Sequence, residues 1–106
     1  MADYVKVAKV SDIPPGGRLI TEADDGLWVA IFNVDGALYA IEDVCPHDEG
    51  PIGEGDLHNT YIIECPRHGQ RFDIRDGSRQ QLASTGDVPT FEVRVQGDDV
   101  LVRVDQ

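Results

Sequence analysis

Alternation of apolar and polar residues is clearest near the two ends of the chain. Apolar side chains recur at every second position within residues 4–9, 91–95 and 100–104, and Gly97-Asp98-Asp99 separates the last two stretches. A period of two is the spacing of one face of a β-strand. The pattern predicts a first strand over residues 4–9 and a terminal hairpin with one buried face. The side chains expected on that face are Phe91, Val93, Val95, Val100, Val102 and Val104.

A longer apolar stretch predicts the centre of the fold. Residues 27–34 are apolar on both faces, which is typical of an inner strand packed on two sides, and we expect Trp28 in the core. Asp35-Gly36 follows at once and suits a type I′ turn, because both central residues of that turn need positive φ. Residues 37–42 then form the returning strand. Shorter strands are expected at residues 18–21, 56–57, 61–64 and 71–74.

Glycine and proline separate these segments and leave no convincing helix. Eleven Gly and six Pro are spread along the 106 residues, and residues 43–55 and 78–89 lack any apolar period. About eight to ten short strands without helices predict an all-β fold, as a small antiparallel sandwich or barrel. A chain of this length holds one core of modest size, so residues 1–106 are expected to form a single domain.

Charge and hydropathy exclude several kinds of partner. Twenty acidic residues against nine basic ones give a formal net charge of -11, which repels nucleic acid and anionic membranes and favours a basic partner. The longest apolar run, residues 27–32, is far too short to cross a bilayer. The first residues lack the layout of a secretion signal, so we expect a soluble, cytoplasmic protein.

Two short turns, Cys45-Pro46-His47 and Cys65-Pro66-Arg67-His68, hold both cysteines and two of the three histidines. Thiolates and imidazoles on turns are the ligands that zinc and iron–sulfur centres use. Structural zinc sites usually pair Cys with Cys and His with His, whereas each pair here is mixed. Each turn could give its Cys to one metal and its His to the other, which favours a binuclear centre. A zinc-stabilised interaction module stays open as an alternative.

The two motifs resemble the signature of Rieske iron–sulfur proteins, C-x-H followed by C-x-x-H, and the agreement continues through Gly69 to Phe72-Asp73. The resemblance implies a small antiparallel β-sandwich with a cluster-binding subdomain at one end. It also implies one [2Fe-2S] cluster per chain, with exposed histidines that face the partner protein. The ligands implied are Cys45, His47, Cys65 and His68.

Departures from the respiratory Rieske proteins narrow the resemblance. Gly50 and Arg67 stand where those proteins have an additional cysteine in each loop. Gln70 and Phe72 stand where their Ser and Tyr hydroxyls donate hydrogen bonds to the sulfurs and raise the potential. The chain therefore resembles the soluble, low-potential Rieske ferredoxins. We expect a reduction potential near the lower end of the Rieske range, about -150 mV.

The remaining residues do not predict a substrate site. With two histidines committed to the cluster, only His58 is left, which we expect in a surface turn, and a mononuclear iron site needs two. No glycine-rich nucleotide fingerprint is found either. The resemblance implies an electron carrier, not itself an enzyme, between a flavin-dependent reductase and a terminal oxygenase such as a ring-hydroxylating dioxygenase. A Rieske-like small subunit of a nitrite reductase, or of another multisubunit oxidoreductase, is the alternative.

Overall fold

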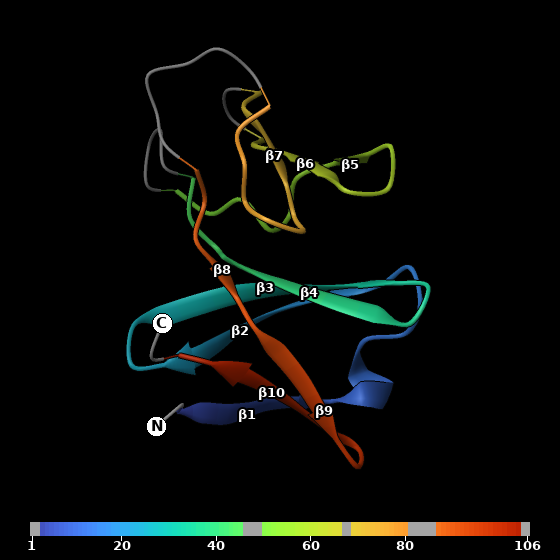
Figure 1. The fold of residues 1–106 in the computed structure, drawn as a ribbon. Coiled ribbons are helices and arrows are strands. Elements are labelled where there is room, and N and C mark those ends of the chain that lie inside the picture. Colours follow the sequence, from blue (N-terminus) through green and yellow to red (C-terminus); the bar gives the residue numbers. More distant parts are fainter. Residues whose placement is uncertain (1–2, 46–49, 67–68, 81–86, 105–106) are drawn as a thin grey trace.

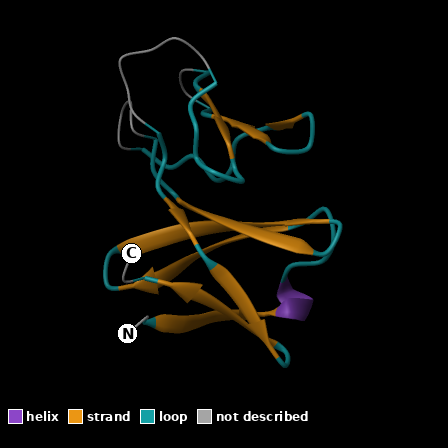
Figure 2. Cartoon of the chain, in the orientation of Figure 1, coloured by secondary structure: helices purple, strands orange, loops and turns teal. Residues whose placement is uncertain are grey.

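The computed structural model describes residues 3–45, 50–66, 69–80 and 87–104. Within these ranges ten strands form three antiparallel sheets (Figures 1 and 2), so the predicted all-β, antiparallel fold is confirmed. One short 3₁₀ turn, η1 (Val10–Asp12), was not predicted. The Asp12 carboxylate accepts a hydrogen bond from the Lys9 amide at 2.9 Å and holds this turn. No helix of the described residues could span a membrane.

The three sheets are stacked from bottom to top in Figure 1. The lower sheet has the order β1 (Tyr4–Lys9), β10 (Asp99–Arg103), β9 (Val93–Gln96). The middle sheet has the order β2 (Arg18–Asp24), β3 (Leu27–Val34), β4 (Ala37–Glu42), β8 (Thr90–Phe91). The upper sheet has the order β5 (Leu57–His58), β6 (Ile62–Glu64), β7 (Arg71–Asp73), and it forms the subdomain predicted at one end of the sandwich.

Strand β3 packs on both faces, as predicted for residues 27–34. Val29 and Ile31 lie in a core shared with the lower sheet, whereas Ala30 and Phe32 lie in a core shared with the upper sheet. The middle sheet therefore separates two cores. The lower core also contains Ala8, Ile13, Ala40, Val100 and Val102. The upper core also contains Ile41, Cys45, Ile52, Ile63, Cys65, Phe72, Ile74 and Val88.

The β3–β4 hairpin has the predicted turn. Asp35 and Gly36 adopt φ values of 52° and 94°, which is the left-handed pair that a type I′ turn requires. Asn33 supports the turn from the buried side, because its side-chain oxygen accepts a hydrogen bond from the Gly36 amide at 2.8 Å. Its side-chain nitrogen donates to the Ile13 carbonyl at 2.7 Å and so ties the 13–17 loop to the hairpin. This second role of Asn33 was not predicted from the sequence.

Two predictions of buried side chains were wrong. Trp28 is 49% exposed, because it lies at the open end of β3 rather than over the centre of the sheet. Val95 is 51% exposed: it lies on β9, the edge strand of the lower sheet, and lines an open groove together with Val10 and Leu38. Of the other apolar residues expected on that face, Val100 and Val102 are fully buried, whereas Phe91, Val93 and Val104 are partly buried.

The stretch expected as one strand over residues 91–95 is split. β8 ends at Phe91 and pairs with β4 of the middle sheet, whereas β9 begins at Val93 and pairs with β10 of the lower sheet. The chain thus changes sheets at Glu92, which an alternating pattern alone does not reveal.

Strand β2 is longer than predicted, because a bulge between Glu22 and Asp24 lets its pairing with β3 continue.

Candidate metal centre

Cys45 and Cys65 come from different loops and both lie in the upper core. Each residue is 0% exposed and belongs to the same cluster of buried side chains. Cys45 follows β4 after two residues, and Cys65 follows β6 directly. The structure therefore brings together the two thiols that the sequence predicted as ligands. The two predicted imidazole ligands, His47 and His68, lie outside the described residues.

The two cysteine turns close in the same way. The Cys45 amide donates to the Gly50 carbonyl at 2.7 Å, and the Cys65 amide donates to the Gln70 carbonyl at 2.7 Å. In each case the acceptor lies five residues after the cysteine, so both motifs span loops of equal length. Gly69, with φ of 72°, donates a further hydrogen bond to the Cys65 carbonyl at 3.0 Å. The two cysteines thus begin loops that are closed by equivalent backbone hydrogen bonds.

Asp43 shapes the first loop from the inside. One oxygen of its carboxylate, Oδ1, accepts hydrogen bonds from the amides of Ile52 at 2.9 Å and Gly53 at 2.6 Å. Its own amide donates to the Trp28 carbonyl at 2.8 Å, which extends the contact with the end of β3. The segment before Cys45 is thereby fixed to the segment that returns after the first motif.

Arg18 clamps the same returning segment from the other side. Its Nη1 donates to the carbonyls of Gly53 at 2.7 Å and Gly55 at 2.6 Å, and its guanidinium lies 5.3 Å from the centre of the Phe32 ring. The backbone at Gly55 approaches β6 so closely that a Cβ there would lie 1.8 Å from the Glu64 carbonyl oxygen. Residues 53–55 thus connect the first loop to the strand that leads into the second.

Replacing Asp43 with alanine is expected to destabilise the upper core. Two amide bonds to a partly buried carboxylate are lost, and each such bond contributes about 1.5–3 kcal/mol. We expect an apparent melting temperature about 10–20 °C lower and faster loss of any bound metal group. The measurement is thermal unfolding under anaerobic conditions at a fixed heating rate.

Asp43→Asn is the matched control, because it keeps one acceptor oxygen and removes only the charge. Its melting temperature should fall by less than half as much as that of Asp43→Ala. Equal stability of the wild type and Asp43→Ala would show that this carboxylate does not support the loop.

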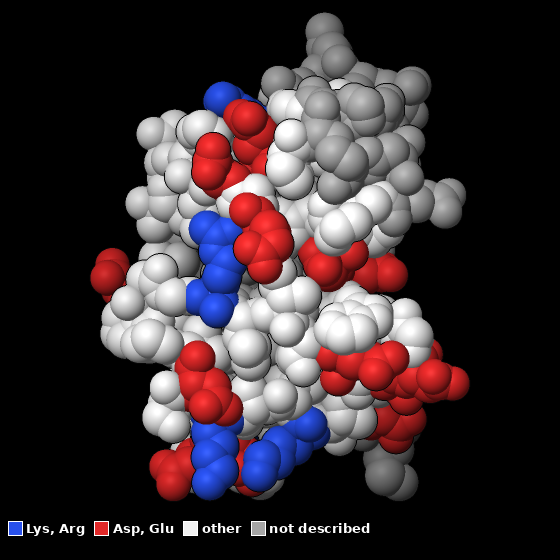
Figure 3. Space-filling model, turned by 180° about the vertical axis from the view of Figure 1, so that it is seen from behind, with Lys and Arg blue, Asp and Glu red and all other residues white. Residues whose placement is uncertain are grey.

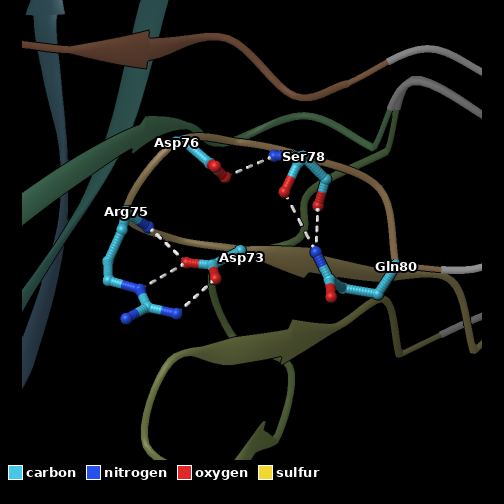
Figure 4. Close-up of polar contacts among 5 residues, drawn as sticks. All are labelled: Asp73, Arg75, Asp76, Ser78 and Gln80. Carbon is cyan, nitrogen blue, oxygen red and sulfur yellow. Dashed lines mark hydrogen bonds and ion pairs between the residues drawn. The ribbon is translucent and has the colours of Figure 1, made fainter.

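The loop after β7 is held by a second carboxylate (Figure 4). Asp73 is only 8% exposed, and its Oδ1 accepts hydrogen bonds from the Arg75 amide at 2.9 Å and from Nε at 3.0 Å. Its Oδ2 lies 2.7 Å from Arg75 Nη2. These hydrogen bonds from Arg75 hold the pKa of Asp73 below its usual value. The guanidinium also stacks 4.0 Å from the centre of the Tyr61 ring.

Polar contacts continue along the turn. Asp76 Oδ1 accepts from the Ser78 amide at 2.9 Å, and this bond lowers the pKa of Asp76. Gln80 Nε2 donates to the carbonyl and to the hydroxyl of Ser78, both at 3.0 Å (Figure 4). The Arg79 amide then donates to Asp87 at 3.0 Å, across residues 81–86, which lie outside the described part of the chain.

Arg75→Met is expected to lower the melting temperature by a few degrees at neutral pH. The folded-state pKa of Asp73 lies below its unfolded value, so the pair stabilises the fold above that unfolded value. The stabilisation is lost as the pH falls through the lowered pKa. The difference in melting temperature between wild type and variant should therefore be constant above about pH 5 and shrink below about pH 4. A difference independent of pH would contradict the proposed role of this carboxylate, and Arg75→Lys should retain part of the effect.

His58 is not in a surface turn, as the sequence predicted, but in β5, where its side chain is 35% exposed. Its Nε2 lies 3.0 Å from Glu64 Oε1, and the same oxygen accepts a hydrogen bond from Arg71 Nε at 3.0 Å. The three side chains connect one strand of the upper sheet to the next. Their arrangement indicates a structural role beside Cys65.

The donor set fits a cluster with two cysteine ligands. Within the described ranges no group of three or more His, Cys, Asp or Glu residues could hold a metal ion. A four-ligand site built on the buried cysteines therefore needs ligands from outside the described residues, where the two predicted histidines, His47 and His68, lie.

Comparison with known proteins gives the same family as the motifs. The family model of the Rieske-like [2Fe-2S] domain matches residues 3–103. The biphenyl dioxygenase ferredoxin subunit of Pseudomonas sp. strain KKS102 is 34% identical over 99 residues, which cover 93% of this chain and 90% of that protein.

Two solved structures have similar folds. A ferredoxin in a complex of reduced oxygenase and oxidized ferredoxin of carbazole 1,9a-dioxygenase has a TM-score of 0.83 and 32% identity, covering 94% of this chain and 92% of that chain. A protein described as an NADH-dependent nitrite reductase small subunit, from Mycobacterium tuberculosis, has the same TM-score at 22% identity, covering 100% of this chain and 98% of that chain. At that identity the second likeness shows the fold alone.

Proposed function

This chain belongs to the family of Rieske-like [2Fe-2S] domains, and on that premise we propose that it is a one-electron carrier between a flavin-dependent reductase and a terminal oxygenase. The family predicted from the two motifs is confirmed. Its relatives are ferredoxin subunits of dioxygenases, so the protein is an electron-transfer component rather than a catalytic one. The proposed unit is the whole of residues 1–106, acting as one domain with one cluster.

The observation that carries the proposal is the pair of buried cysteines with equivalent turns. We assign Cys45 and Cys65 to one iron and His47 and His68 to the other. When bound, such a cluster accepts and releases one electron. The protein keeps both thiols in the upper core, away from water. Phe72 is fully buried in that core and has no hydroxyl to donate to a sulfur, which supports a reduction potential of about -150 mV.

The relatives and the charge support the choice of partners. A ferredoxin 32% identical to this chain has been solved with the oxygenase of its dioxygenase system. The formal net charge of -11 favours brief, electrostatically steered contacts with basic partners. We place the carrier in the cytoplasm together with those partners.

Anaerobic purification followed by metal analysis and spectroscopy tests the proposal. We expect a coloured protein with two irons and two acid-labile sulfides per chain. Dithionite should reduce it to a species that gives an electron paramagnetic resonance signal. A colourless protein that contains zinc and gives no such signal would establish the zinc-stabilised module instead.

The alternative of a nitrite reductase subunit has a different readout. The structural neighbour of that kind supports the shared fold but not the shared partner, since it is 22% identical. A carrier should be isolated alone, whereas a subunit should co-purify with its catalytic chain at constant stoichiometry. Purification from the native host through a tag on this chain separates the two.

A further inference from the structure

Trp28 is exposed on the side of the protein that holds the cysteine loops. Along β3, Val29 points to the lower core and Ala30 points to the upper core. Side chains alternate along a strand, so Trp28 projects on the same face of the middle sheet as Ala30. The upper sheet covers Ala30 completely but leaves 49% of Trp28 exposed. It is the single tryptophan of the chain.

The backbone of Trp28 lies beside the segment that leads into the first motif. The Trp28 carbonyl accepts a hydrogen bond from the Asp43 amide at 2.8 Å, and Asp43 is two residues before Cys45. On its other side, Trp28 is paired with Glu22 of β2. Trp28 therefore carries an exposed aromatic side chain at a backbone position between the segment that leads into the proposed cluster and the acidic residue Glu22.

The negative charge of the protein is concentrated in the same part of the chain. Residues 19–66 contain eleven acidic residues and no lysine or arginine, so this segment alone accounts for the formal net charge of -11. The β2–β3 turn lies at the left in Figure 1 and therefore at the right-hand edge of Figure 3. That edge shows acidic side chains, whereas the lysines and arginines lie on the left and lower parts of the view.

Carboxylates close to Trp28 are held in place by the turn itself. Glu22 Oε2 accepts a hydrogen bond from the Gly26 amide at 2.9 Å, and Asp24 Oδ1 accepts one from the Asp25 amide at 2.8 Å. In the described part of the chain, no ion pair neutralises Glu22, Asp24 or Asp25. The carboxylates of Glu22 and Asp24 are therefore held in place near this end of β3 and are available to a partner of opposite charge.

We propose that Trp28 anchors the docking of a redox protein whose electron-transfer site is surrounded by lysine and arginine side chains. The inference rests on the proposed function, since it names a contact of the same carrier. Tryptophan residues often supply most of the binding energy of an interface, and an indole also attracts cations to its face. The acidic residues then steer the encounter, and Trp28 prolongs the complex.

Electron transfer to a basic cytochrome c tests this inference. Stopped-flow oxidation of the dithionite-reduced protein gives the second-order rate constant, and Trp28→Ala should lower it at least about five-fold at low salt. Trp28→Phe should keep most of the rate. Val95→Ala is the matched control, because Val95 is 51% exposed but lies on β9 of the lower sheet, and it should react like the wild type. A wild-type rate for Trp28→Ala would overturn the proposal.

A second readout does not depend on electron transfer. Protein labelled with 5-fluorotryptophan gives one fluorine resonance from the chain's single tryptophan, and cytochrome c should shift or broaden it in a salt-dependent manner. An unchanged resonance at saturating cytochrome c would also overturn the proposal. As a control, the iron content and the electron paramagnetic resonance spectrum of each variant should match those of the wild type. A wild-type protein without a cluster would instead refute the proposed function, and the fluorine titration would still decide the docking site.

Discussion

Replacing Cys45 with serine is expected to abolish the cluster and to leave the lower half of the fold in place. A serine hydroxyl does not ionise near neutral pH as a thiol does, so it is a poor ligand for iron. Cys45 lies in the upper core, whereas the lower core between the lower and middle sheets contains neither cysteine. The loss of ordered structure should therefore extend through the β5–β6–β7 subdomain and end at the middle sheet.

The measurement combines iron and sulfide analysis with amide hydrogen exchange. Cys45→Ser should contain less than about a tenth of the wild-type iron, while amides of β1, β9 and β10 stay protected. Ala8→Ser is the matched control, because it places the same hydroxyl in the lower core and should keep a full cluster. A normal reducible cluster in Cys45→Ser would show that the ligand assignment is wrong.

The central strand and the motifs could be read from the sequence because their signals are local. Residues 27–34 are apolar at both odd and even positions, and a strand with two apolar faces must lie between two layers. Asp35-Gly36 specified its turn through the φ values that these residues tolerate. The two cysteines predicted a shared site because they and the histidines occur at the spacing of the Rieske signature.

The predictions from sequence failed where contacts between distant parts of the chain determine the burial or the pairing of a residue. Trp28 has the pattern of a core residue, yet how far the upper sheet extends over β3 determines its exposure. Glu92 interrupts no pattern, but the chain passes from the middle to the lower sheet there. No role was predicted for Asp43, although its carboxylate organises the amides of Ile52 and Gly53, about ten residues later.

Gly77→Ala is expected to cause a large loss of stability while leaving the proposed ligands unchanged. Gly77 has φ of 79° and joins the upper sheet to the segment before β8: its amide donates to the Asp73 carbonyl at 2.7 Å, and its carbonyl accepts from the Val88 amide at 2.9 Å. A Cβ at this position would lie 2.0 Å from the Val88 carbonyl oxygen. Alanine must therefore separate two backbone segments that now touch.

Gly26→Ala separates the two causes of this effect. Gly26 has φ of 76°, almost the same as Gly77, but a Cβ there would meet nothing within 4 Å. It should therefore show only the left-handed backbone strain, about 1–2 kcal/mol. Gly77→Ala adds about 1–3 kcal/mol for forced displacement, so its melting temperature should fall about twice as far and its visible absorbance should bleach sooner on heating. Equal losses in the two variants would show that the contact with Val88 does not hold the upper sheet to the middle sheet.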